Sequence, residues 1–161
     1  MLAGVFLLAT ACTPAPRPLD PSFESPDAVA REVLRLMAAG DINGLRALAV
    51  TEQEFRATIW PELPAARPER NLPFSYVWGD LRQKSEASLS SLLVQHRGHR
   101  FELVGVRFGD RTPYASYVVH RDTVLIVTDS ATEGPPEDVR LCGSLIEQKG
   151  RWKVFSYVVD D

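Results

Sequence analysis

The sequence predicts an α+β domain in which a block of helices is followed by an antiparallel sheet of four to five strands. Two observations predict this class. Residues 26–95 carry apolar side chains at helical spacing, whereas residues 101–159 contain strand-length runs rich in Val, Ile, Phe and Tyr. Helices and strands that are segregated along the chain are typical of α+β domains. We therefore assign residues 26–161 to a single domain, a length that fits one hydrophobic core.

The first two helices have clear start and stop signals. Ser25 is a suitable N-cap, Pro26 occupies the first helical position, and Gly40 can end the helix in the left-handed conformation. Asp41 follows directly and can cap a short second helix. We therefore expect two consecutive helices that meet at a tight turn.

A third helix begins at the sequence T-E-Q-E, in which Thr51 and Glu54 form a capping-box pattern. It is expected to end near Trp60, because Pro61 disfavours helical geometry in the residue before it. After a proline-rich loop, apolar residues at helical spacing predict a fourth helix over residues 74–95. The polar stretch SEASLSS weakens this pattern, so the helix either continues or breaks there.

The second half of the chain predicts strands over residues 101–108, 114–128, 139–148 and 151–159. The run from residue 114 is either one bent strand or a hairpin that turns at Arg121-Asp122. Lys149-Gly150 is typical of a two-residue hairpin turn. Because the last strand is apolar on both faces, we predict that it is central in the sheet and covered on both sides.

The order of these elements resembles that of the nuclear-transport-factor-2-like superfamily. Two segments carry the resemblance, namely AAGDINGLRALA between the first two helices and IEQKGRWKVFSYVV at the closing hairpin. The resemblance covers about residues 25–160 and implies a curved sheet that wraps the helices into a cone-like arrangement with a pocket. It implies no particular activity, because members of the superfamily include enzymes, binding modules and scaffolds.

The chain opens with MLAGVFLLATAC, in which residues 2–8 are uniformly apolar or small. This run is too short to span a bilayer, which needs about 20 residues. It matches the apolar core of a signal peptide, which runs about 7–15 residues. Ala9 and Ala11 supply the small residues of a cleavage site. We therefore assign residues 1–11 to a signal peptide.

The sequence Ala9-Thr10-Ala11-Cys12 resembles the lipobox of bacterial lipoproteins. The resemblance implies that the sulfur of Cys12 carries a diacylglyceryl group, that cleavage occurs before this residue, and that the new N-terminus is acylated. Several acyl chains would hold the protein durably on a membrane. The protein would then be lipid-anchored in the cell envelope, outside the cytoplasm, in the periplasm or on the surface. A plain secreted protein is the alternative.

Residues 12–25 contain four prolines, and a fifth, Pro26, follows directly; this run predicts an extended tether between this anchor and the domain. The formal net charge of −3 offers no basic footprint for nucleic acid. The sequence has no glycine-rich nucleotide loop and no CxxC pair, and we predict no cofactor. Cys142 lies in an apolar run and is expected to be a buried, inert thiol, with a disulfide to Cys12 as the alternative.

Two sets of polar residues are candidates for chemistry. His120 and Asp122 would serve as a general-base pair if the fold points them into its pocket; otherwise they are polar groups of an edge or turn. His96 and His99 have the i, i+3 spacing of some metal sites, with Glu102 as the nearest third ligand. A solvated helix end is the alternative for this pair, and we predict no metal.

Three functions remain open at this point. The main hypothesis is a non-catalytic, membrane-anchored domain that binds a small apolar ligand or a protein partner. Trp78, Leu103 and Tyr157 are then candidates for lining the pocket, and packing in the core is the alternative for them. The second hypothesis is a hydrolase or isomerase that uses His120 and Asp122. The third is a scaffold or assembly subunit, which predicts an exposed apolar patch and no pocket.

Overall fold

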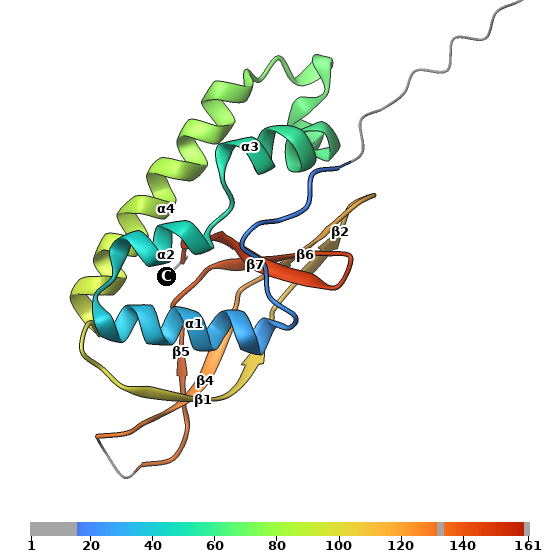
Figure 1. Cartoon of the computed structure of the whole chain (residues 1–161). Coiled ribbons are helices and arrows are strands. Elements are labelled where there is room, and N and C mark those ends of the chain that lie inside the picture. Colours follow the sequence, from blue (N-terminus) through green and yellow to red (C-terminus); the bar gives the residue numbers. More distant parts are fainter. Residues whose placement is uncertain (1–15, 132–133, 160–161) are drawn as a thin grey trace, which may run out of the picture.

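The computed structural model describes residues 16–131 and 134–159 and confirms the α+β class (Figure 1). The predicted signal peptide and Cys12 lie outside these residues. The α-helices come first: α1 Pro26–Ala39, α2 Ile42–Leu48, α3 Glu52–Glu54 and α4 Phe74–His96. The strands follow: β1 Phe101–Arg107, β2 Arg111–Pro113, β3 Val118–Arg121, β4 Val124–Asp129, β5 Glu137–Val139, β6 Ser144–Gln148 and β7 Arg151–Ser156.

The starts of the first three helices and the end of α1 lie where the local sequence predicts. The hydroxyl of Ser25 caps α1, the carboxylate of Asp41 caps α2, and Thr51 with Glu54 forms the capping box of α3. Gly40 ends α1 with a φ of 68°, in the left-handed region where glycine has no steric penalty.

Beyond α3 the helical geometry changes instead of stopping at once. Residues Phe55–Ile59 form a π-helical turn and Trp60–Glu62 a 3-10 turn. Two more 3-10 turns follow in the proline-rich loop. α4 then runs without interruption through SEASLSS, so the predicted weak point does not break the helix.

The strands form two antiparallel sheets, of order β1-β4-β5 and β2-β3-β6-β7, where the sequence predicted one sheet of four to five strands. The long run from residue 114 turns at Asp122, whose φ is 51°. The two flanking strands do not pair with each other, because β3 pairs with β6 and β4 pairs with β1. The chain therefore passes from one sheet to the other at this turn.

Two clusters of buried apolar side chains stabilise the domain. The first lies between α1, α2, the C-terminal half of α4 and the sheet β1-β4-β5. The second joins the segment around Phe55 and the N-terminal half of α4 to the four-stranded sheet. β7 serves both, because Val154 belongs to the first cluster and the next residue, Phe155, packs against the second. This explains why β7 is apolar on both faces.

The prediction that β7 is central is wrong, because β7 is an edge strand of its sheet. Its outer edge is nevertheless covered by other parts of the chain. Phe23 and Trp152 exchange two backbone hydrogen bonds of 2.8 Å, and the backbone N–H of Val50 donates to Val154 at 2.9 Å. Backbone N–H and C=O groups that an edge strand would otherwise leave free for another chain are therefore hydrogen-bonded within this domain. Lys149 and Gly150 form the β6–β7 turn as predicted, both with positive φ.

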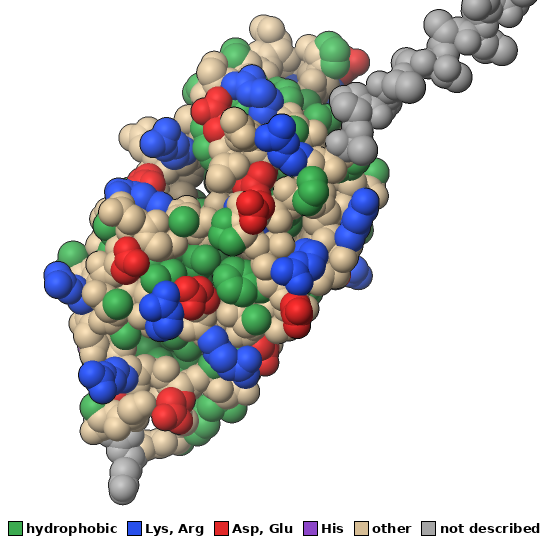
Figure 2. Space-filling view, in the orientation of Figure 1, with side chains coloured by type: hydrophobic (Ala, Val, Ile, Leu, Met, Phe, Trp, Pro, Cys, Tyr) green, Lys and Arg blue, Asp and Glu red, His purple; other side chains and the backbone are tan. Residues whose placement is uncertain are grey.

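The described part of the expected tether, residues 16–25, lies along the domain (Figure 1). Leu19 is buried in the second cluster. Figure 2 shows charged side chains of both signs over one face of the molecule, with hydrophobic side chains gathered near its middle. No helix in the described residues is both long enough and apolar enough to cross a membrane.

Candidate functional site

A groove of about 270 Å³ opens between α2, α4 and β7. Apolar side chains dominate its lining: Val50, Trp78, Leu81, Leu89, Phe155 and Tyr157. Polar groups, including Arg46, Arg82 and Glu86, also line it. Its volume is close to the lower end of the range for small-molecule sites, about 300–1,000 Å³. The groove therefore suits a small, largely apolar ligand.

Two regular elements place the apolar side chains on facing walls. On α4, Trp78, Leu81 and Leu89 recur at intervals of three and eight residues, which puts them on one helical face. Phe155 lies near the end of β7 and Tyr157 follows directly after its last residue, and both side chains line the groove. Leu89 and Tyr157 are both 1 % exposed, so they form the closed end of the groove.

Tyr157 is held by both helices that border the groove. Its hydroxyl donates a 2.7 Å hydrogen bond to the backbone oxygen of Leu45 in α2, and its backbone N–H donates a 3.0 Å bond to the hydroxyl of Ser85 in α4. Burial raises the pKa of the Tyr157 phenol, and nearby Cys142 adds to the shift. The ring is therefore a fixed, neutral wall of the groove at physiological pH.

An ion pair bridges α2 and α4 at the mouth of the groove. Arg46 places its Nε atom 3.1 and 2.9 Å from the two carboxylate oxygens of Glu86, and its terminal nitrogen contacts the same carboxylate at 2.8 Å. The hydrogen bonds that Arg46 donates to Glu86 raise the pKa of Arg46. Glu52, also on the rim, pairs with Arg56 at 2.7 Å. Both acidic groups at the rim are thus engaged in ion pairs.

Of the three residues predicted to line a pocket, the structure brings two together. Trp78 and Tyr157 both line this groove. Leu103 lies elsewhere, on β1, where it borders an open depression beside α1. Leu81 and Leu89 belong to the apolar pattern that predicts the helix over residues 74–95, but they were not among the residues predicted to line a pocket. Their spacing from Trp78 on α4 was the available signal.

His120 and Asp122 do not form an acid–base pair in a cleft. The ring of His120 is 8 % exposed, and its centroid lies 4.8 Å from that of Phe108 and 4.6 Å from that of Trp152. Its Nε2 atom lies 3.0 Å from Glu147, a carboxylate the sequence analysis had not associated with it. Asp122 lies at the exposed turn that follows β3 and lines another cavity, of which His120 is not part.

The remaining candidate residues are the proposed metal ligands and Cys142. The Nδ1 atom of His99 lies 3.8 Å from Asp129, and its ring stacks on Phe101, whereas Glu102 is exposed on β1. In the described ranges no group of three or more His, Cys, Asp or Glu residues could hold a metal ion. Cys142 is a buried free thiol, as predicted, and burial raises its pKa to about 12.

Comparison of the chain with protein-family models, with curated proteins and with solved structures finds no significant match in any of the three.

Proposed function

We propose that this protein is a lipid-anchored binding protein of the bacterial cell envelope, held by acylated Cys12, whose domain binds a small apolar molecule in the groove between α2, α4 and β7. The observation that carries the binding function is the groove itself, in which Trp78 and Phe155 present partly exposed aromatic surface, and buried Tyr157 lies behind it, around a space of about 270 Å³. Aromatic walls favour a ligand with a ring or a short hydrocarbon chain.

The chemistry of the groove favours binding over catalysis. General acid–base catalysis needs a titratable group whose pKa lies near the working pH and which reaches the substrate. In the groove, Glu86 is engaged by Arg46, and burial keeps Tyr157 neutral. The rival pair of the enzyme hypothesis, His120 and Asp122, lies outside the groove.

Titration with toluene, followed by the methyl NMR signals of Val50, Leu81 and Leu89, tests the binding function. We expect these signals to shift and saturate. Leu81→Arg should abolish the shifts of the other two residues, because it places a long charged side chain in the groove. Val94→Arg is the matched control, since Val94 lies on the same helix but is 88 % exposed and outside the groove. Absence of saturable shifts in the wild-type protein, or equal shifts in the Leu81→Arg variant, would contradict the proposal.

The anchor is tested separately. Mass spectrometry of protein from the native host should find a mature N-terminus that begins at acylated Cys12. The Cys12→Ser variant should leave the membrane fraction. A variant that stays in the membrane fraction would show that another feature holds the protein there.

A further inference from the structure

We infer that the end of the domain that carries Pro16 and the β6–β7 turn lies against the phospholipid headgroups, with the sheet β1-β4-β5 turned away from the membrane. This inference rests on the proposed lipid anchor at Cys12. It adds how the domain is oriented on the membrane. A tether of residues 12–25 would let the domain turn freely, but the chain is already attached to the domain at Arg17, five residues after Cys12.

The first described residues are attached to the domain from Arg17 onward. The side chain of Arg17 donates a 2.9 Å hydrogen bond to Gln53, and its backbone oxygen accepts a 3.1 Å bond from the buried hydroxyl of Thr58. Leu19 is 4 % exposed. These contacts come from the segment around α3, so they fix the start of the chain to the domain surface.

Asp20 and the residues after it continue the attachment. The backbone N–H of Asp20 donates to Glu54 at 2.7 Å, and its backbone oxygen accepts a 2.6 Å bond from Lys153. Phe23 then pairs with Trp152 on the outer edge of β7. Glu54 and Lys153 form a buried ion pair at 2.9 Å. Residues 17–23 therefore cannot extend as a spacer without losing the hydrogen bonds of Asp20 to this pair and the pairing of Phe23 with the edge of β7.

Only four residues, 13–16, separate Cys12 from Arg17. Five Cα-to-Cα steps reach at most about 18 Å in any conformation. A domain of this size has a radius of gyration of about 15 Å, which corresponds to a diameter of about 40 Å. Because the free chain is shorter than the domain is wide, the end opposite Arg17 cannot reach the bilayer to which Cys12 is anchored.

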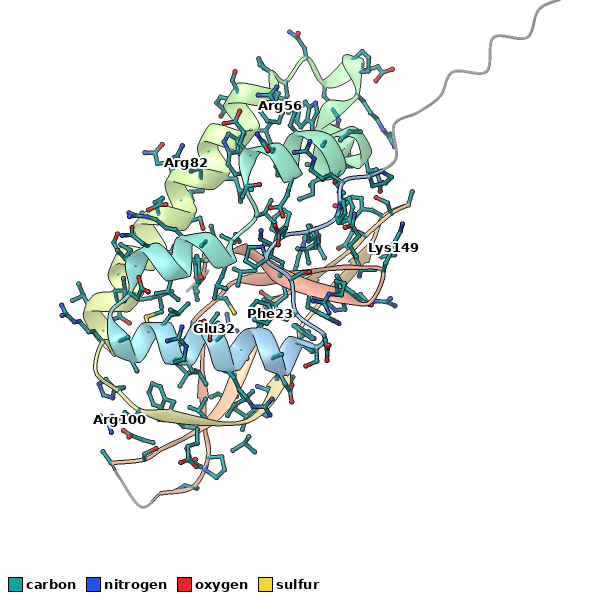
Figure 3. The ribbon with its side chains drawn as sticks, in the orientation of Figure 1. Phe23, Glu32, Arg56, Arg82, Arg100 and Lys149 are labelled. Carbon is teal, nitrogen blue, oxygen red and sulfur yellow. The ribbon has the colours of Figure 1, made fainter. Side chains whose placement is uncertain are left out.

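The surface near this attachment offers cationic groups to the headgroups. Lys149 and Arg151 line a cavity together with Pro16, and Lys149 is exposed at the tip of the β6–β7 turn. Asp20 and Glu24 are acidic residues of the same segment, and Glu24 approaches Arg151 at 3.9 Å. Figure 3 shows Lys149 on the side of the molecule where the chain emerges, and Arg100 toward the opposite end.

Quenching by nitroxides attached to lipid headgroups tests the orientation. The acylated protein is reconstituted in phosphatidylglycerol–phosphatidylethanolamine vesicles, with a fluorophore on a cysteine introduced by Lys149→Cys or, as the matched control, by Arg100→Cys. Both positions are exposed, and buried Cys142 should not react. We expect a large loss of fluorescence for the label at position 149 and no loss above background at position 100. Equal quenching at the two positions would overturn the inference. Unfolding midpoints equal to that of the wild-type protein establish that both variants fold.

Lengthening the free chain is the second arm. A flexible Gly-Ser insertion between Pro14 and Ala15, longer than the domain is wide, should remove the difference between the two labels. A difference that persists would show that chain length does not set the orientation and would overturn the inference. If Cys12 proves not to be acylated in the host, the proposed anchor fails. In that event, protein coupled through Cys12 to a maleimide lipid still reports whether a short attachment orients the domain.

Discussion

The Nζ atom of Lys153 lies 2.9 Å from both carboxylate oxygens of Glu54, and neither side chain is more than 5 % exposed. The pair joins the middle of β7 to the last residue of α3. The same carboxylate accepts hydrogen bonds from the backbone N–H groups of Thr51 and Asp20. A buried charge needs such partners, because removal from water costs several kcal/mol per ion. The pair therefore locks the first ordered residues, the helical segment and the sheet into one unit.

Lys153→Met should lower the free energy of unfolding by about 3–5 kcal/mol, because it leaves the carboxylate of Glu54 buried without its cation. The double variant Lys153→Met/Glu54→Gln should lose less than Lys153→Met alone, since no uncompensated charge remains. Urea denaturation measures both. Lys84→Met is the control: the Lys84–Asp80 pair is exposed, and its removal should cost no more than about 1 kcal/mol. A double variant as unstable as the single one would contradict this account.

Acid should weaken the domain through Glu54. Burial tends to raise the pKa of this carboxyl group, but hydrogen bonds from Thr51, Asp20 and Lys153 outweigh it and hold the pKa below the ordinary value of 4.5. A depressed pKa contributes stability above the unfolded-state pKa, and that stability is lost as the pH falls through the folded-state value. Urea denaturation from about pH 6 to about pH 3 should show a steeper loss for the wild-type protein than for Glu54→Gln. Parallel curves would exclude Glu54 as the cause.

Gly143→Ala should strongly destabilise the domain. A Cβ atom at this position would overlap the backbone carbonyl of Val158, so the C-terminal segment would have to move, and with it Tyr157 in the groove. Overpacking of this kind costs about 1–3 kcal/mol or more. Gly79→Ala is the matched control, since a Cβ atom there meets no other atom within 4 Å. Because Gly79 lies within α4, that change should raise the stability by up to about 1 kcal/mol. Thermal denaturation measures both changes: the midpoint should fall for Gly143→Ala and should not fall for Gly79→Ala.

Tyr157→Phe should cost about 1 kcal/mol of stability, because it removes the hydroxyl that donates to the backbone oxygen of Leu45. The apolar wall of the groove stays in place, so toluene should still shift the methyl signals of Leu89. Tyr76→Phe, at a position that is 65 % exposed, should leave the stability unchanged. A stability of Tyr157→Phe equal to that of the wild-type protein would show that this hydrogen bond does not hold the groove.

Cys142 should be inert in the folded protein. Its side chain is buried and its pKa is raised to about 12, so the reactive thiolate is scarce and shielded. In the Cys12→Ser variant, Ellman's reagent at mildly alkaline pH should react only as fast as the domain unfolds. The same variant in urea should react at once and serves as the positive control. Rapid reaction of the folded variant would place Cys142 at an accessible site.

The candidate site was predictable only in part. Trp78 and Tyr157 were proposed for a pocket because large aromatic residues often line one, and both line the groove. Leu103, an aliphatic residue proposed together with them, lies on the other sheet. The residues next to each of the three in the sequence do not show which of them line the groove. That depends on how α4 and β7 pack against each other. Glu147 beside His120 was missed for the same reason, because the two residues are 27 positions apart.

The sequence by itself determined the helix boundaries and the tight turns, as Ser25, Gly40, Thr51 and the Lys149-Gly150 turn illustrate. These signals are local, because a cap or a turn acts on backbone groups within a few residues. Only the tertiary structure decided that the strands divide between two sheets, that β7 is an edge strand covered by Phe23, and that Lys153 meets Glu54 across 99 positions. Such contacts join residues far apart in the sequence. Many arrangements of the strands are compatible with the same apolar pattern, and the one that buries the core most completely is selected only when the whole chain packs.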